Sequence, residues 1–192
     1  LRCVIQPLVA GFLTGGALIV AIGAQNAYVL RQGLARQHVG AVIAVCALSD
    51  VVLILAGVAG VGSLVTRVPW LITAVTWLGV AFLLWYAAGA LRRAARPEAL
   101  TANGAPVAPE ARSRVVGRAV ALTWLNPHVY LDTVLLVGSI AATHEAHGTD
   151  LVDGRWIFGA GAAAASIVWF TSLGYGARQL APLLARPRSW QV

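Results

Sequence analysis

The chain has very few charged residues. Of its 192 residues, 11% are charged and 59% are hydrophobic, and the mean hydropathy is +0.77. Soluble domains carry about 25% charged residues, roughly twice as many. So little polar surface could not cover a water-facing exterior, which excludes a soluble globular protein. We therefore expect most of the chain to lie in lipid.

Other absences narrow the function. The two cysteines, Cys3 and Cys46, lie far apart and form no CxxC motif, so neither a redox site nor a disulfide is predicted. The sequence contains no HExxH motif and no paired Ser/His/Asp constellation. We therefore expect neither an enzyme nor a resident cofactor.

Five apolar runs are long enough to cross a bilayer, which takes about 20 residues. The first is too long for a cleavable signal peptide, and further runs follow it. The pattern predicts an all-α polytopic membrane bundle, with residues 1–192 forming a single transmembrane transporter domain. The expected spans are Leu8–Leu30, Val39–Val65, Trp70–Leu91, Ala119–Ala142 and Trp156–Ala177.

The basic residues indicate the orientation. All fourteen are Arg, and eleven lie in the first loop, in the third loop and after the fifth span, which leaves Arg2, Arg67 and Arg155 for the other side. By the positive-inside rule the eleven-residue side is cytoplasmic, so the N-terminus is predicted outside the cytoplasmic (inner) membrane. This topology also explains the net charge of +7, so no nucleic-acid partner is predicted.

The chain reads as two related halves. Residues 92–114 are rich in Ala, Pro and Arg and are interpreted as a cytoplasmic linker. It separates a first repeat, residues 1–91, from a second, residues 115–192. Transporters are commonly built from inverted repeats whose broken helices meet at the midplane. The second half holds only two spans, so the sequence leaves two alternatives, a five-span protein or a truncated six-span one. The repeats favour the second, and we expect five spans of a six-span protein with two inverted three-helix repeats. The matching positions are QNAYVL from Gln25 with PHVYLD from Pro127, and Ser49 and Gly57 with Ser166 and Gly174.

Polar residues interrupt the segment LTWLNPHVYLDT, residues 122–133. Pro127 removes a backbone donor and should break its helix. An ionised carboxylate such as Asp132 is costly in hydrocarbon unless it is paired or faces water. His128 lies four residues before Asp132, so both would share one helix face. The pair could form a structural hydrogen bond, whereas a metal site would need more ligands than these two.

A further group of polar residues, in the first half of the chain, is predicted to form the other part of the site. It lies around the end of the first span. Gly23 precedes the polar pair Gln25 and Asn26, and Asp50 is the only charged residue of the second span. Freed backbone and helix N-termini can bind a carboxylate, while Asp can bind an ammonium group or a proton. Structural roles remain open: Asp50 could hydrogen-bond for packing, and Gly23 and Pro127 could merely accommodate helix crossing.

Five sequence blocks carry a resemblance to a known family. They are GAQNAYVLRQGLARQHV (23–39), CALSDVVLILAG (46–57), VTWLGVAFLLWY (75–86), LTWLNPHVYLDTVLLVGS (122–139) and RWIFGAGAAAASIVWF (155–170). Together they resemble the L-lysine exporter (LysE) family of basic amino-acid efflux proteins. The resemblance implies an inner-membrane exporter of L-lysine or L-arginine, with six helices in two inverted repeats, driven by the proton motive force. The family's Gly-Pro-Gln-Asn signature falls on residues 23–26, with Ala24 where many members have Pro. Its Ser-Asp falls on Ser49 and Asp50, and its Asn-Pro on Asn126 and Pro127.

Expelling a cation against an interior-negative potential costs about 2.3 kcal/mol per 100 mV, so exchange for a proton is the expected coupling. We hypothesise that Asp50 and Asp132 alternately neutralise the substrate ammonium and the proton. Rival interpretations are export of neutral amino acids or of a metal cation by the same carboxylates. The expected partners are a basic amino acid, a proton and the lipid bilayer, and a homo-oligomer is left open. The candidate substrate-binding residues are Gln25, Asn26, Asp50, Asn126, Pro127, His128 and Asp132.

Overall fold

Every element of the computed structural model is helical within the residues that it describes, which are 2–20, 23–60, 69–94, 110–144 and 153–184. This confirms the all-α class. In chain order the elements are α1 (Arg2–Ile19), α2 (Ala24–Ala35), α3 (Val39–Val58), α5 (Pro69–Ala94), α6 (Arg112–Trp124), α7 (Pro127–Val129), the π-helix η2 (Tyr130–Leu136), α8 (Val137–Ala142) and α9 (Gly154–Leu184).

Two of the expected spans are broken helices. The chain turns by 82° between α1 and α2 and by 57° between α6 and the α7–α8 segment. The run Leu8–Leu30 is therefore not one span in a single direction, because the chain is extended at Gly23 (φ −106°, ψ 178°) just before α2 begins. The break expected at Pro127 is confirmed: Asn126 is extended, and its Oδ1 accepts a hydrogen bond from the backbone N–H of His128 at 3.1 Å.

The second break continues into a π-helix. Within η2 the hydrogen bonds run five residues back, and the N–H of Val137 donates to the carbonyl of Asp132. Such wide turns are rare and occur often at functional sites, because the extra residue changes the direction of nearby side chains. Here the wide turn contains Asp132, one of the predicted site residues.

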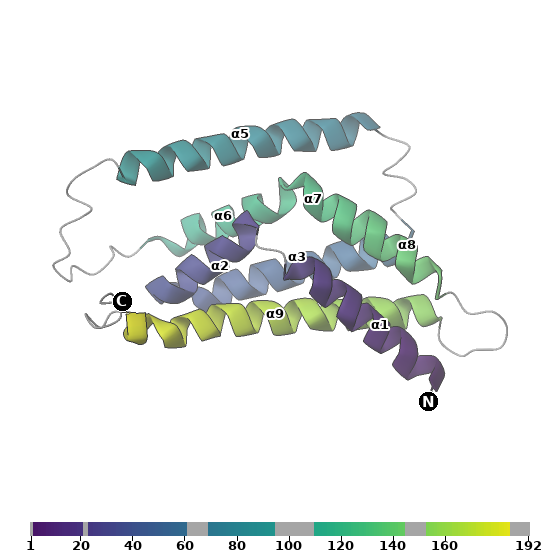
Figure 1. The fold of residues 1–192 in the computed structure, drawn as a ribbon. Coiled ribbons are helices and arrows are strands. Elements are labelled where there is room, and N and C mark those ends of the chain that lie inside the picture. The colour runs from purple at the N-terminus through teal and green to yellow at the C-terminus, as the bar shows by residue number, and fades with distance from the viewer. Residues whose placement is uncertain (1, 21–22, 61–68, 95–109, 145–152, 185–192) are drawn as a thin grey trace.

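Two unbroken helices, α3 and α9, each pack against the broken helix from the other half of the chain. α9 lies along both α1 and α2, and it also contacts α3 (Figure 1). In the same way α3 packs against α6, η2 and α8. Both breaks are therefore held beside the two central helices α3 and α9.

Small residues allow the close helix crossings. A Cβ added at Gly11 would collide with the carbonyl oxygen of Phe158, where α1 crosses α9. At the crossing of α3 with η2 and α8, a Cβ added at Gly57 would lie 2.8 Å from the carbonyl oxygen of Val134, and one at Gly138 would lie 2.6 Å from that of Gly57. Close backbone approach of this kind is typical of helix packing in membranes.

The outer helix faces are apolar. Phe158 and Phe170 are fully buried, whereas Leu48 and Val52 on α3 and Trp77 on α5 are exposed. Within the described ranges, two helical stretches are long and apolar enough to cross a membrane, Val39–Val58 and Gly154–Leu180, and the number rises to four if each bent pair counts as one span. α5 contributes the shorter apolar stretch Thr76–Gly89. A multi-pass membrane protein accounts for this composition and exposure.

The segment assigned to the linker is partly helical. α5 continues to Ala94, and α6 begins at Arg112. Residues 95–109, the central part of that segment, lie outside the described residues. At the start of α6, the carboxylate of Glu110 forms an ion pair of 2.6 Å with Arg118.

Candidate functional site

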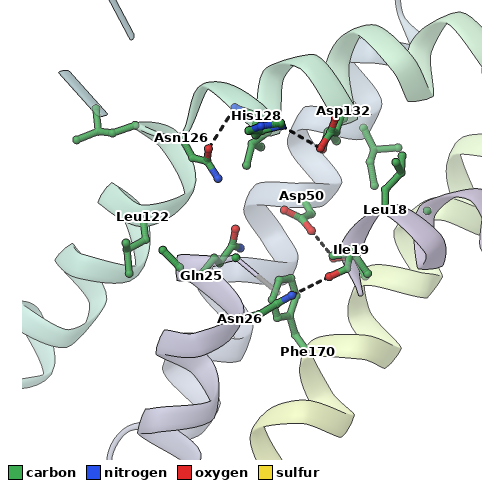
Figure 2. A pocket seen from close by; sticks show the side chains of 18 of the residues that line it. Leu18, Ile19, Gln25, Asn26, Asp50, Leu122, Asn126, His128, Asp132 and Phe170 are labelled. Carbon is green, nitrogen blue, oxygen red and sulfur yellow. Dashed lines mark hydrogen bonds and ion pairs between the residues drawn. The ribbon is translucent and has the colours of Figure 1, made fainter. Parts of the chain in front are cut away.

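A cavity of about 470 Å³ lies where the two helix breaks meet. Residues of every described helix line it, namely α1, α2, α3, α5, α6, α7, η2, α8 and α9. Six of the seven predicted substrate-binding residues lie on its wall, and the seventh, Pro127, is the first residue of α7. Figure 2 shows the polar side chains from both halves directed at one space. The six are Gln25, Asn26, Asp50, Asn126, His128 and Asp132.

Asp50 is buried on the α3 wall of the cavity, with 6% of its surface exposed. Its Oδ2 accepts a hydrogen bond of 2.8 Å from the hydroxyl of Ser166 on α9. Within the described part of the chain, no basic side chain forms an ion pair with Asp50. A buried carboxylate without a countercharge is unfavourable, so a cation or a proton in the cavity would be strongly attracted to it.

Asn26 ties the first break together. Its amide nitrogen Nδ2 donates to the carbonyl oxygen of Ile19 at 2.8 Å, which bridges the end of α1 to the start of α2. Its Oδ1 accepts a hydrogen bond of 3.2 Å from the indole Nε1 of Trp169 on α9. Both ends of the Asn26 amide are thus occupied by protein groups, which indicates that Asn26 holds the break.

Gln25 and Asn126 bring amide groups to the cavity from the two breaks. The Nε2 of Gln25 is buried and has no oxygen or nitrogen acceptor among the described residues, and the neighbouring thiol of Cys46 is only a weak acceptor. Asn126 uses its Oδ1 to cap α7, and no described group accepts from its Nδ2. The first turn of α2 also has no side-chain cap at Gly23, so backbone N–H groups there lack intrahelical partners. These donors are suited to a carboxylate ligand.

His128 and Asp132 lie on one face of the second broken helix, as their spacing predicts. The distance from His128 Nδ1 to Asp132 Oδ2 is 3.7 Å. Their side chains are 79% and 43% exposed, whereas Asp50 is deeply buried. The two carboxylates of the site therefore have different environments: Asp50 is shielded from water, and Asp132 is accessible to it.

A metal site is not supported by this arrangement. Among the residues that the structure describes, no three His, Cys, Asp or Glu side chains gather closely enough to hold a metal ion. His128 and Asp132 remain an isolated pair.

Sequence reasoning missed the contribution of α9 and α5. Ser166 and Phe170 of α9 line the cavity, as do Phe82 and Leu83 of α5. Ser166 had been matched to Ser49 as a repeat position but was given no role. A single hydroxyl within the alanine-rich run GAAAASIVWF was the available signal.

Comparison with known proteins gives consistent results. The sequence matches the LysE type translocator family over residues 17–192. It is 45% identical over 182 residues to the arginine exporter protein ArgO of Yersinia enterocolitica, covering 95% of this chain and 85% of that protein. It is 39% identical over 209 residues to the lysine exporter LysE of Corynebacterium efficiens, covering 95% of this chain and 89% of that protein. No solved structure matches the chain.

Proposed function

The chain belongs to the family of LysE type translocators, and we propose that it exports L-arginine, L-lysine or both across the cytoplasmic membrane in exchange for protons. The two relatives are named for arginine export and for lysine export. Export of amino acids fits both names, and the preference for basic amino acids rests on the chemistry of the cavity.

The observation that carries the proposal is the pairing of two carboxylates with amide donors around one cavity. A basic amino acid has one carboxylate and two cationic groups. In our proposal Gln25, Asn126 and the start of α2 hold the carboxylate, while Asp50 and Asp132 attract the cations. Asn26 stabilises the break between α1 and α2, Pro127 interrupts the helix between α6 and α7, and His128 pairs with Asp132.

The same carboxylates provide the coupling. A cation leaving an interior-negative cell moves against about 2.3 kcal/mol per 100 mV, and an incoming proton cancels that charge movement. We propose that Asp50 and Asp132 exchange substrate cation for proton as the cavity opens alternately to the two sides. The more exposed Asp132 would take the proton first.

The architecture proposed for this function is a six-helix fold of two inverted repeats, with the N-terminus outside. The reciprocal packing of α3 and α9 against the opposite broken helix supports it, because each half then contributes equivalent parts. The clustering of Arg residues supports the orientation.

The cavity favours a basic over a neutral amino acid. A neutral amino acid would bring a single ammonium group and leave one of the two carboxylates unneutralised. A metal cation would leave the amide donors of Gln25 and Asn126 without a carboxylate to bind.

Efflux from dipeptide-loaded cells tests the proposal. Cells that lack their own exporters are loaded with arginine-, lysine- or threonine-containing dipeptides, and the appearance of each free amino acid outside is followed with and without expression of the protein. Arginine or lysine efflux that depends on the protein is the expected result. Efflux of threonine alone would contradict it, and so would metal tolerance without amino-acid efflux.

A further inference from the structure

One face of α9 contacts two elements of the polar site. Ser166 and Trp169 lie three residues apart, and residues at this spacing share a helix face. Ser166 Oγ donates to the carboxylate of Asp50 at 2.8 Å, and Trp169 Nε1 donates to Asn26 Oδ1 at 3.2 Å. α9 therefore holds one residue of α3 and one residue of the α1–α2 break.

The Ser166 bond fixes how the carboxylate of Asp50 is presented. Ser166 is 1% exposed, so water does not compete for its hydroxyl. With Oδ2 held by α9, no described residue donates to Oδ1 of Asp50, which leaves that oxygen for a ligand in the cavity. A hydrogen bond to a charged group in a dry site is among the stronger ones in proteins.

The Trp169 bond fixes the orientation of the Asn26 amide. An indole N–H can only donate, so the atom of Asn26 that faces it must be the oxygen. The nitrogen is then directed at the Ile19 carbonyl, which can only accept. If the indole N–H were lost, the amide could turn and the bridge across the break would weaken.

We propose that Ser166 and Trp169 are positioning residues of the transport site: Ser166 holds the carboxylate of Asp50 toward the cavity, and Trp169 holds Asn26 across the α1–α2 break. This inference rests on the proposed function. The geometry of the site is thus set by α9, although α9 contributes none of the charges that line it.

Small substitutions can separate the positioning roles of Ser166 and Trp169 from their contributions to helix packing. Ser166→Ala removes one oxygen within an alanine-rich stretch, and Ser166→Thr keeps the hydroxyl. Trp169→Phe keeps an aromatic ring and removes the N–H. Matched controls are Ser139→Ala, which removes an exposed hydroxyl that donates to the Leu135 carbonyl, and Trp156→Phe, at an exposed position in the first turn of α9.

Counterflow of radiolabelled arginine and lysine into proteoliposomes containing the purified full-length protein separates KM from the maximal rate. We expect Ser166→Ala to raise KM roughly tenfold, as for loss of a hydrogen bond to a charged group, while the melting temperature changes little. Ser166→Thr should restore KM to within about twofold. Trp169→Phe should raise KM severalfold, and both controls should match the wild type.

Wild-type KM values in Ser166→Ala and Trp169→Phe would overturn the inference. If Ser166→Ala accumulates poorly, Ser166→Cys retains a weak donor: an intermediate KM supports the positioning role, and a wild-type KM contradicts it. The Asp50→Asn variant distinguishes a failure of the positioning role from a failure of the proposed function. Loss of counterflow in Asp50→Asn with unchanged Ser166 variants defeats only the positioning role. A wild-type protein that carries neither amino acid defeats the proposed function.

Discussion

Asp50 on α3 and Ser166 on α9 are joined by a buried hydrogen bond of 2.8 Å across 116 positions of sequence. The bond links the two central helices, each of which packs against the broken helix of the other half. A movement of α9 relative to α3 would therefore act directly on the carboxylate that we place at the centre of the substrate site.

Replacing Asp50 with Asn should abolish the export of arginine and lysine. The amide has nearly the same shape but cannot attract a cation, and loss of one partner of a buried charge pair costs about 2–5 kcal/mol. Efflux from dipeptide-loaded cells should fall by at least about tenfold. The control is Asp153→Asn, at the start of α9, where the carboxylate pairs with Arg155 outside the cavity. Undiminished efflux in Asp50→Asn would falsify its assignment.

Replacing Asp132 with Asn should remove the dependence of transport on the proton gradient. Asp132 is the more exposed carboxylate of the cavity, so we expect it to exchange protons with water. In wild-type proteoliposomes an inward proton gradient should accelerate arginine efflux. In Asp132→Asn the rate should be the same with and without that gradient. A variant that still responds fully to the gradient would place the coupling proton elsewhere.

Local chemistry made the second break predictable. Pro127 cannot continue a helix, and Asn126 before it is a favoured capping residue, so the position of the second break could be predicted from two adjacent residues. The i, i+4 relationship of His128 and Asp132 followed from helix geometry in the same way. Each of these features depends on residues within one turn of each other.

The hydrogen bond between Asp50 and Ser166 could not be predicted from local sequence. Nothing near Asp50 in the sequence indicates that Ser166 is its hydrogen-bond donor, because that contact depends on how α3 and α9 pack.

The bend in the first span could not be predicted from hydropathy. Apolar length gave Leu8–Leu30 as one span, since hydropathy measures how apolar a run is and carries no information on its direction. The extended backbone at Gly23 changes that direction, and both arms contact α9, which is far away in the sequence.

Replacing Gln25 with Leu should stabilise the empty protein and impair transport. The Nε2 of Gln25 is buried with no oxygen or nitrogen acceptor in the described structure, and an unsatisfied buried donor costs about 1–3 kcal/mol. Removing it should raise the melting temperature in detergent by a few degrees, about 2–4 °C per kcal/mol. Arginine counterflow should show a raised KM, because the substrate carboxylate loses a donor.

A gain in stability together with a loss of transport identifies a functional residue, since replacing a residue retained for stability would lower the melting temperature. Gln179→Leu, at an exposed position on α9, is the control and should leave KM unchanged. A Gln25→Leu protein that transports with wild-type KM would show that this amide does not bind substrate.

Replacing Gly57 with Ala should destabilise the protein although alanine is the better helix former. The added Cβ would lie 2.8 Å and 2.9 Å from the carbonyl oxygens of Val134 and Thr133, so two backbones must separate. Overpacking of this kind costs about 1–3 kcal/mol, more than the roughly 0.5–1 kcal/mol gained by removing a helical glycine. Gly117→Ala is the matched control, because nothing lies within 4 Å of its added Cβ. The melting temperature should fall for Gly57→Ala and stay level or rise for Gly117→Ala. Equal shifts in the two variants would show that α3 does not cross η2 and α8 at this close distance.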